Sequence, residues 1–161
     1  MIYDTGHKFR GHFLDGMRHG KGFMEMPGAR TLEGVWEYNE IKEGTYTYSD
    51  GSQYIGQWQF RERNGQGTLI YADGRKYVGG FKSGRRHGKG TLYYPDGRVY
   101  VGDFQDGERT GQGTMTYPDG RKYIGEFKDG ERSGPGALIY PDGRKQEGEF
   151  RDGEYVGRGQ D

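Results

Sequence analysis

The segment closest to a catalytic motif is Gly88-Lys89-Gly90-Thr91, whose residue types resemble those of a phosphate-binding loop. Its spacing does not fit that chemistry. Ser83 stands where the first glycine of such a loop belongs, and Gly90 separates the lysine from the threonine. The segment also precedes a predicted strand, whereas phosphate binding uses the N-terminus of a helix. We therefore interpret it as part of a repeat.

The four histidines do not predict a metal site either. His19 and His87 occupy the same Arg-His-Gly slot in copies of the repeat that lie six strands apart, or ~29 Å at the usual strand spacing. His7 and His12 have no cysteine to assist them, because the chain contains none. The carboxylates recur mainly in Asp-Gly turns, and no nucleophile, base and orienting acid stand together. We predict no catalytic residues, no cofactor and no metal, and hence no enzyme.

These residues belong to a unit of about 23 residues that recurs along the chain. Residues 77–99 read YVGGFKSGRRHGKGTLYYPDGRV, and the next two stretches of the same length repeat this pattern almost position for position. Each copy opens on an aromatic-x-Gly-x-aromatic pattern, except where Leu32 and Gln146 replace the first aromatic residue. We divide the chain into partial copies at 1–8 and 146–161 and complete copies at 9–31, 32–53, 54–76, 77–99, 100–122 and 123–145.

Each copy predicts two short strands, because its two runs are rich in aromatic and β-branched residues and bounded by Gly, Asp and Pro. Pro95-Asp96-Gly97 predicts a type I turn followed by a glycine bulge, which would close a tight hairpin to the next copy. At the other end we expect a loop of six residues, from Lys82 to His87. No connection is long enough for a parallel crossover, so the sheet should be an antiparallel meander.

Strand alternation places the invariant residues on one face, where offset stacked rings would lie flat over glycines. This arrangement accounts for a composition of 33 glycines, 15% aromatic residues and only 30% hydrophobic residues. We assign a structural role to the invariant positions: Tyr77, Gly79, Phe81, Gly88, Gly90, Leu92, Tyr94, Asp96 and Gly97.

The pattern Y-x-G-x-F/W-x-x-G-x-x-x-G-x-G-x-x-x-Y-x-D-G resembles the MORN repeat family, and the resemblance extends from Tyr3 to Gly159. It implies an elongated, twisted, single-layer antiparallel sheet of stacked hairpins with a groove along one side. It also implies a protein-binding scaffold, often with cytoskeletal or membrane-associated partners. Some members of the family bind phosphoinositide-type lipids, and many dimerise.

Binding specificity should reside in positions that vary between copies. Trp36 and Trp58 occupy the same slot in consecutive copies and could contact a protein partner; alternatively, they fill space where the copy at 32–53 is one residue short. Apolar residues on the face opposite the invariant rings could bind a partner, or could cover one another through sheet twist. These are Ile55, Ile70, Val78, Tyr93, Val101, Ile124 and Ile139.

The charge pattern offers a second surface. The chain has no net charge, so we do not expect nucleic-acid binding. Residues 61–98 nevertheless hold nine Lys or Arg against three Asp or Glu. A cluster at one sheet edge could bind anionic phospholipid headgroups or an acidic partner, or could simply be solvated. It comprises Arg61, Arg63, Lys82, Arg85, Arg86 and Lys89.

The two ends of the chain suggest a location and a mode of assembly. The N-terminus has no apolar segment of a targeting or membrane-spanning kind, so we expect a cytoplasmic protein or one on a soluble membrane face. Neither end has a cap, and bare sheet edges pair with other chains. Either the sequence is cut from a longer array or its ends meet partners, and in the second case we predict homodimerisation through an end strand.

Overall fold

The computed structural model describes residues 5–158, so the predicted ends of the repeat pattern at Tyr3 and Gly159 lie outside the described residues. The described part of the chain forms strands and no helix. The fourteen strands are β1 (Lys8–Leu14), β2 (Met17–Met26), β3 (Arg30–Glu37), β4 (Glu40–Thr47), β5 (Gln53–Gln59), β6 (Glu62–Ile70), β7 (Lys76–Lys82), β8 (Arg85–Tyr93), β9 (Val99–Gln105), β10 (Glu108–Thr116), β11 (Lys122–Lys128), β12 (Glu131–Ile139), β13 (Lys145–Arg151) and β14 (Glu154–Gly157).

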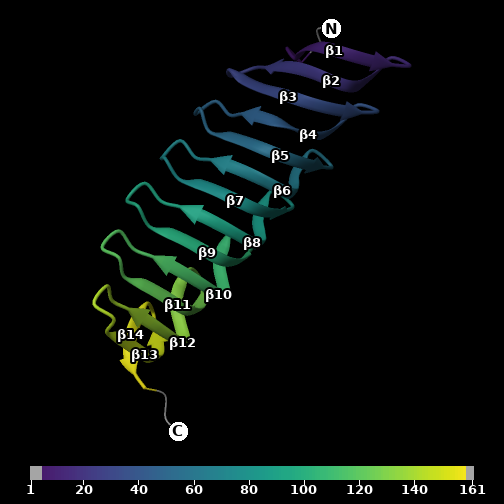
Figure 1. Cartoon of the computed structure of the whole chain (residues 1–161). Coiled ribbons are helices and arrows are strands. Elements are labelled where there is room, and N and C mark those ends of the chain that lie inside the picture. The colour runs from purple at the N-terminus through teal and green to yellow at the C-terminus, as the bar shows by residue number, and fades with distance from the viewer. Residues whose placement is uncertain (1–4, 159–161) are drawn as a thin grey trace. The chain divides into compact units, whose positions relative to one another are not determined.

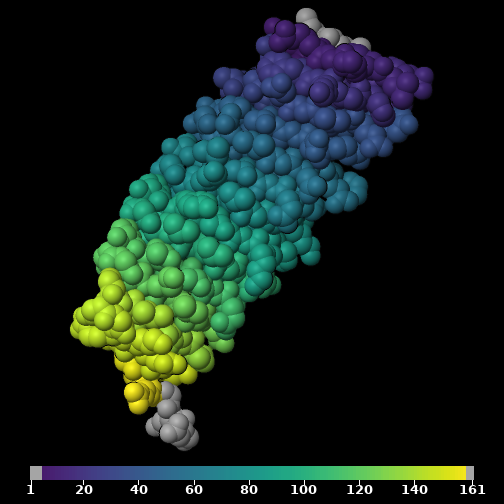
Figure 2. All heavy atoms as spheres, in the orientation of Figure 1, coloured from purple at the N-terminus to yellow at the C-terminus, as the bar shows by residue number. Residues whose placement is uncertain are grey.

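The strands fall into two compact units, Met1–Gly84 with β1 to β7 and Arg85–Asp161 with β8 to β14. Within each unit every strand pairs antiparallel with the strands that precede and follow it in the chain, as Figure 1 shows. The space-filling view agrees, because successive residue colours form neighbouring bands within each unit (Figure 2). The predicted all-β antiparallel meander of hairpins is confirmed.

The Pro-Asp-Gly turn has the predicted geometry. The amide of Gly97 donates to the carbonyl of Tyr94 at 3.0 Å, and the amide of Tyr94 donates to the carbonyl of Arg98 at 2.9 Å. Gly97 itself has a φ of 96°, in the region that glycine adopts without cost. The same pair of bonds closes the turns that begin at Tyr117 and Tyr140.

The expected six-residue loop at the other end is wrong. Strand β7 ends at Lys82 and β8 begins at Arg85, so only Ser83 and Gly84 connect them. Both have positive φ, of 50° and 79°. The equivalent pair within the second unit, Asp106 and Gly107 between β9 and β10, has φ of 50° and 88°, as in the type I′ turns that match the twist of a hairpin. The other residues of the expected loop belong to the strands. In the strands a glycine such as Gly111, with a φ of 59°, lies at a break in register, as in a β-bulge.

The core of each unit is a row of rings on one face of the sheet. The four tyrosines that open regular copies are 0% exposed, namely Tyr54, Tyr77, Tyr100 and Tyr123. Each hydroxyl donates to the carbonyl three residues further on. The rings lie on glycines as predicted, since a Cβ at Gly113 would be 2.5 Å from the Tyr100 ring. Neighbouring rings meet edge to face, however, and not in the offset stack expected.

Candidate functional site

An arginine completes the packing of each regular copy, and sequence reasoning missed it. Arg109 in β10 is half-buried, and its guanidinium lies 5.8 Å from the Tyr100 ring and 5.7 Å from the Phe127 ring of the next copy. The same guanidinium donates to the carbonyl of Gly130. Arginines at the equivalent position donate to the equivalent glycine carbonyls: Arg63, Arg86 and Arg132. The copies at 54–76, 100–122 and 123–145 are therefore each filled by a tyrosine, an arginine and the aromatic ring of the following copy.

The copy at residues 32–53 lacks two of these three groups. Leu32 replaces the tyrosine. Ile41 replaces the arginine, because Ile41 pairs with Trp36 just as Arg109 pairs with Phe104. Both replacements are shorter than the side chains they stand in for. The atoms nearest to a Cβ placed on Gly34 or Gly44 are accordingly backbone atoms of the facing strand, and not a ring.

The missing side chains leave a recess of about 530 Å³ on the ring-bearing face of the first unit. This volume lies within the range of small-molecule and side-chain binding pockets. Its floor is apolar and formed by Met24, Leu32, Trp36, Ile41, Tyr46 and Trp58. Its rim is polar and formed by Thr5, His7, Arg18, Asn39 and Arg61.

The two predicted tryptophans both line this recess. Trp36 is only 2% exposed, and its ring packs edge-on against Phe9 with centroids 5.0 Å apart. Trp58 is half-buried, lies 5.0 Å from the Tyr54 ring, and donates its indole N–H to the carbonyl of Gly44 at 3.4 Å. Their contact with a partner stays a prediction. The structure nevertheless places them together, as their shared slot suggested.

The rim of the recess carries positive charge. Arg18 donates from its backbone amide to Oδ1 of Asn39 at 2.8 Å and from its guanidinium to the Asn39 carbonyl at 3.1 Å. Arg61 is exposed and occupies a turn. No carboxylate is among the described residues that line the recess. Its surroundings therefore favour an uncharged or anionic ligand group over a cationic one.

Two turns beside the recess have unusual residues. Asn39 and Arg61 line the recess, and the residues before them, Tyr38 and Phe60, are 55% and 83% exposed. All four have positive φ, of 47° at Tyr38, 70° at Asn39, 51° at Phe60 and 62° at Arg61. Other copies place Asp or Ser followed by Gly at these positions. A bulky residue in this conformation costs about 1–3 kcal/mol, and such strain gathers at functional sites.

The predicted apolar face is the exposed face of the sheet, and its members alternate with polar residues. In the first unit Ile55 and Val78 flank Thr68, with which both pair. In the second unit Val101 and Ile124 both pair with Thr114. The sheet thus gives each unit a row of β-branched residues in which every other member is a threonine.

The remaining members of that face lie at the turn end of the strands. Ile70 pairs with Lys76, and Tyr93 pairs with Val99. Ile139 pairs with Lys122 on one side and Lys145 on the other. The structure therefore separates Ile70, Tyr93 and Ile139 from the β-branched rows and places charged neighbours beside two of them.

The predicted basic cluster is divided between the two units. Arg61, Arg63 and Lys82 belong to the first, and Arg85, Arg86 and Lys89 to the second. Arg63 and Arg86 occupy the arginine position described above, with their guanidinium groups over aromatic rings. The Lys89 ammonium pairs with Asp103 at 2.6 Å. Arg61, Lys82 and Arg85 remain exposed.

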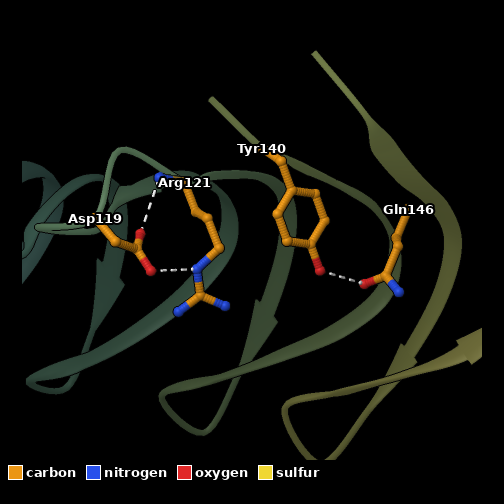
Figure 3. A network of polar contacts seen from close by, with 4 residues as sticks. All are labelled: Asp119, Arg121, Tyr140 and Gln146. Atoms are coloured by element: carbon orange, nitrogen blue, oxygen red, sulfur yellow. Dashed lines mark hydrogen bonds and ion pairs between the residues drawn. The ribbon is translucent and has the colours of Figure 1, made fainter. Parts of the chain in front are cut away.

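The recurring Asp-Gly-Arg turns use their carboxylates structurally. Asp119 accepts from the Arg121 amide at 3.0 Å and from its Nε at 2.7 Å (Figure 3). The bond from the Arg121 amide, more than that from its side chain, lowers the pKa of Asp119 below its ordinary value. In the next turn the Tyr140 hydroxyl bonds to Oε1 of Gln146 at 3.2 Å (Figure 3). The carboxylates of the Asp-Gly-Arg turns thus accept hydrogen bonds within the turns that they stabilise.

Residues 5–158 contain no group of three or more His, Asp or Glu side chains placed to hold a metal ion. Among these same residues there is no apolar helix of a length that would cross a bilayer.

The family model for the MORN repeat matches residues 9–27, 43–53, 54–74, 77–97, 100–120, 123–143 and 147–160. The chain belongs to the MORN repeat family. The longest gap between these matches, residues 28–42, contains Leu32, Trp36, Asn39 and Ile41, all of which line the recess. Four of the eleven residues that line the recess therefore come from the longest stretch that the family model leaves unmatched.

Comparison with curated proteins finds no significant match. Among solved structures, the G-box domain of the microcephaly protein CPAP is 23% identical, with a TM-score of 0.47 over 94% of this chain and 97% of that one. The wild-type TCP10 domain of Danio rerio CPAP is 23% identical, with a TM-score of 0.43 over 92% and 82%. The TCP domain of Drosophila melanogaster SAS-4, solved with a proline-rich motif of Ana2, is 15% identical, with a TM-score of 0.39 over 81% and 84%.

Proposed function

We propose that this MORN chain is a non-enzymatic protein-binding module, and that its first unit receives an apolar side chain of a partner segment in the recess at residues 32–53. One observation carries the proposal. The position that every regular copy fills with its own tyrosine and arginine holds Leu32 and Ile41 instead, and a space of about 530 Å³ results. An apolar floor with a few polar groups at the rim is typical of binding sites.

The size of the missing groups indicates what the recess can hold. A tyrosine and an arginine occupy the equivalent space in regular copies, as Arg109 does between Tyr100 and Phe127. One aromatic or large aliphatic side chain from a partner would replace much of that lost packing. Burying such a side chain contributes about 1.5–3 kcal/mol, enough to anchor a segment whose backbone makes further contacts.

The test is selection from a random dodecapeptide display library against the wild-type chain and against the double variant L32Y/I41R. This variant restores the residues of a regular copy, so it should fill the recess. We expect the selected peptides to bind the wild type and to lose binding to L32Y/I41R. Emission of the two tryptophans, both of which line the recess, reports occupancy by peptides that lack tryptophan.

A matched control carries the same new residues on the exposed face of the second unit. V101Y/I124R leaves the recess intact, and we expect it to bind the selected peptides like the wild type. Peptides that bind L32Y/I41R but not V101Y/I124R would show that the binding site lies on the exposed sheet face, and would contradict the proposal. A library that yields no peptide dependent on the recess would contradict it as well.

A further inference from the structure

We propose that the partner segment is acidic, with carboxylates flanking the apolar side chain that enters the recess, and that Arg61 is the residue that selects it. This inference rests on the proposed function, because it names the chemistry of the segment bound at the same recess. It is carried by the charge at the rim and by the two turns beside it.

Arg61 occupies a position that the fold reserves for glycine. In the equivalent turns the second residue is Gly84, Gly107 or Gly130, with a φ of 79°, 88° or 82°. Arg61 has a φ of 62° there, in a conformation that side chains with a Cβ rarely adopt. The turn would form more easily with glycine, so the arginine is not explained by the local fold. Its position at the rim of the recess offers an explanation.

The charges around the recess are arranged to leave its rim positive. Arg18 and Arg61 line it, and the acidic residues nearest in sequence to the two turns are Glu37, Glu40 and Glu62. Glu37 and Glu40 pair with each other beside Trp36 and Ile41, and Glu62 pairs with Gln59, which follows Trp58 in its strand. Strand alternation therefore directs the three carboxylates to the face opposite the recess. Among the described residues that line the recess, an acidic segment would therefore meet the guanidinium groups of Arg18 and Arg61 and no carboxylate.

The same charges argue against a basic segment. A partner arginine could in principle take the place of the missing arginine beside Trp58, as Arg63 does between Tyr54 and Phe81. It would bring a third cation beside Arg18 and Arg61, which is unfavourable in a half-buried site. A segment with an uncharged apolar side chain and a carboxylate on either side of it would match both the apolar floor and the positively charged rim of the recess.

Phe60 extends the surface next to Arg61. Its ring is 83% exposed and has a φ of 51°, where the copy at 9–31 and those from 77 onward have an aspartate or serine. Aromatic side chains, Phe included, are enriched at protein-binding interfaces. We assign Phe60 to contact the segment as it leaves the recess.

The first experiment reads the composition of the recess-dependent peptides from the display selection. We expect a bulky apolar residue with Asp or Glu on both sides. Recess-dependent peptides without an excess of acidic residues would overturn this inference while the proposed function stood. The absence of any recess-dependent peptide would overturn both.

The second experiment measures the affinity of the consensus peptide, and of its copy with each Glu changed to Gln, by tryptophan emission. We expect R61G to weaken binding of the acidic peptide about fivefold, the upper range for an exposed ion pair, and to leave binding of the Gln peptide unchanged. R61G restores the glycine of the other turns, so its fold should be at least as stable. The matched control R85A removes an exposed cation from the second unit and should bind both peptides like the wild type. Equal binding of the two peptides by the wild type would refute the inference.

Discussion

Replacing Arg109 by isoleucine, the residue that Ile41 supplies in the irregular copy, tests whether the arginine holds a regular copy together. The change removes a hydrogen bond from a guanidinium to the Gly130 carbonyl, which contributes about 1.5–3 kcal/mol for a charged donor. It also removes cation–π contact with the Tyr100 and Phe127 rings, which contributes about 0.5–1 kcal/mol. Part of the loss is offset, because isoleucine is apolar and suits a strand.

We therefore expect R109I to lower the free energy of unfolding by about 2–3 kcal/mol, which for a chain of this size is a fall in Tm of roughly 5–10 °C. Urea unfolding followed by circular dichroism gives the free energy, and calorimetry gives Tm. The matched control is R121I. Arg121 lies in a turn, pairs with Asp119 and has a ring contact of the same kind, with Tyr117 at 5.1 Å, but its guanidinium hydrogen bond goes to a carboxylate of its own turn. Its loss should cost about 1 kcal/mol. If R109I and R121I destabilise the protein equally, the arginine position has no special role in packing.

Four further outcomes can be measured on the same protein. Gly113→Ala should lower the free energy of unfolding by about 1–3 kcal/mol, because the new Cβ would lie 2.5 Å from the Tyr100 ring; an unchanged urea midpoint would contradict the packing of rings on glycines. Burial raises the pKa of Tyr54 and Tyr123 to about 12, so the fold favours their neutral form. The contribution of these two tyrosines to stability should then be constant below about pH 10 and fall between about pH 10 and 12; a denaturant midpoint that stays constant or rises between pH 10 and 12 would show the reasoning wrong. Liposomes of anionic phospholipid should not carry the chain on flotation at physiological salt, because half of the predicted basic cluster is committed to rings or to an ion pair; flotation would restore the lipid alternative. The predicted end-strand pairing should give a particle of twice the chain mass in light scattering at high concentration, and a monomer at every concentration would exclude it.

Much of the fold is readable from the sequence because its determinants are local. The spacing of rings and glycines fixes the faces of each strand, and Pro95-Asp96-Gly97 carries its turn geometry in three consecutive residues. The six-residue loop was wrong for a related reason. Glycine marks both turns and β-bulges, and the sequence around Gly88 does not distinguish the two. Only the pairing of the strands shows which glycines lie in turns and which lie in β-bulges.

The recess was not predictable in the same way. An arginine among Gly and charged residues looks like a solvated surface group, and its packing role depends on a ring and a carbonyl about one copy away, as Arg132 shows with Phe150 and Gly153. The signal was nevertheless present. Aligned copies place Ile41 in a column of arginines and Leu32 in a column of tyrosines. The two departures predict a recess only if one knows that the side chains at these two positions pack in the same space.

The two tryptophans indicate that this departure is a built feature and not a decayed copy. A copy that had simply lost its tyrosine and arginine would be expected to collapse, because close packing of an apolar face is favourable. Here the shortened copy is instead bounded by the largest side chains of the chain. Trp36 is anchored on Phe9, and Trp58 is anchored on Tyr54 and the Gly44 carbonyl. Each wall is held by contacts outside the recess, so the space between them can persist without an occupant. Among the complete copies, the one at residues 32–53 lacks both the tyrosine and the arginine, and its walls are held by the copies on either side of it.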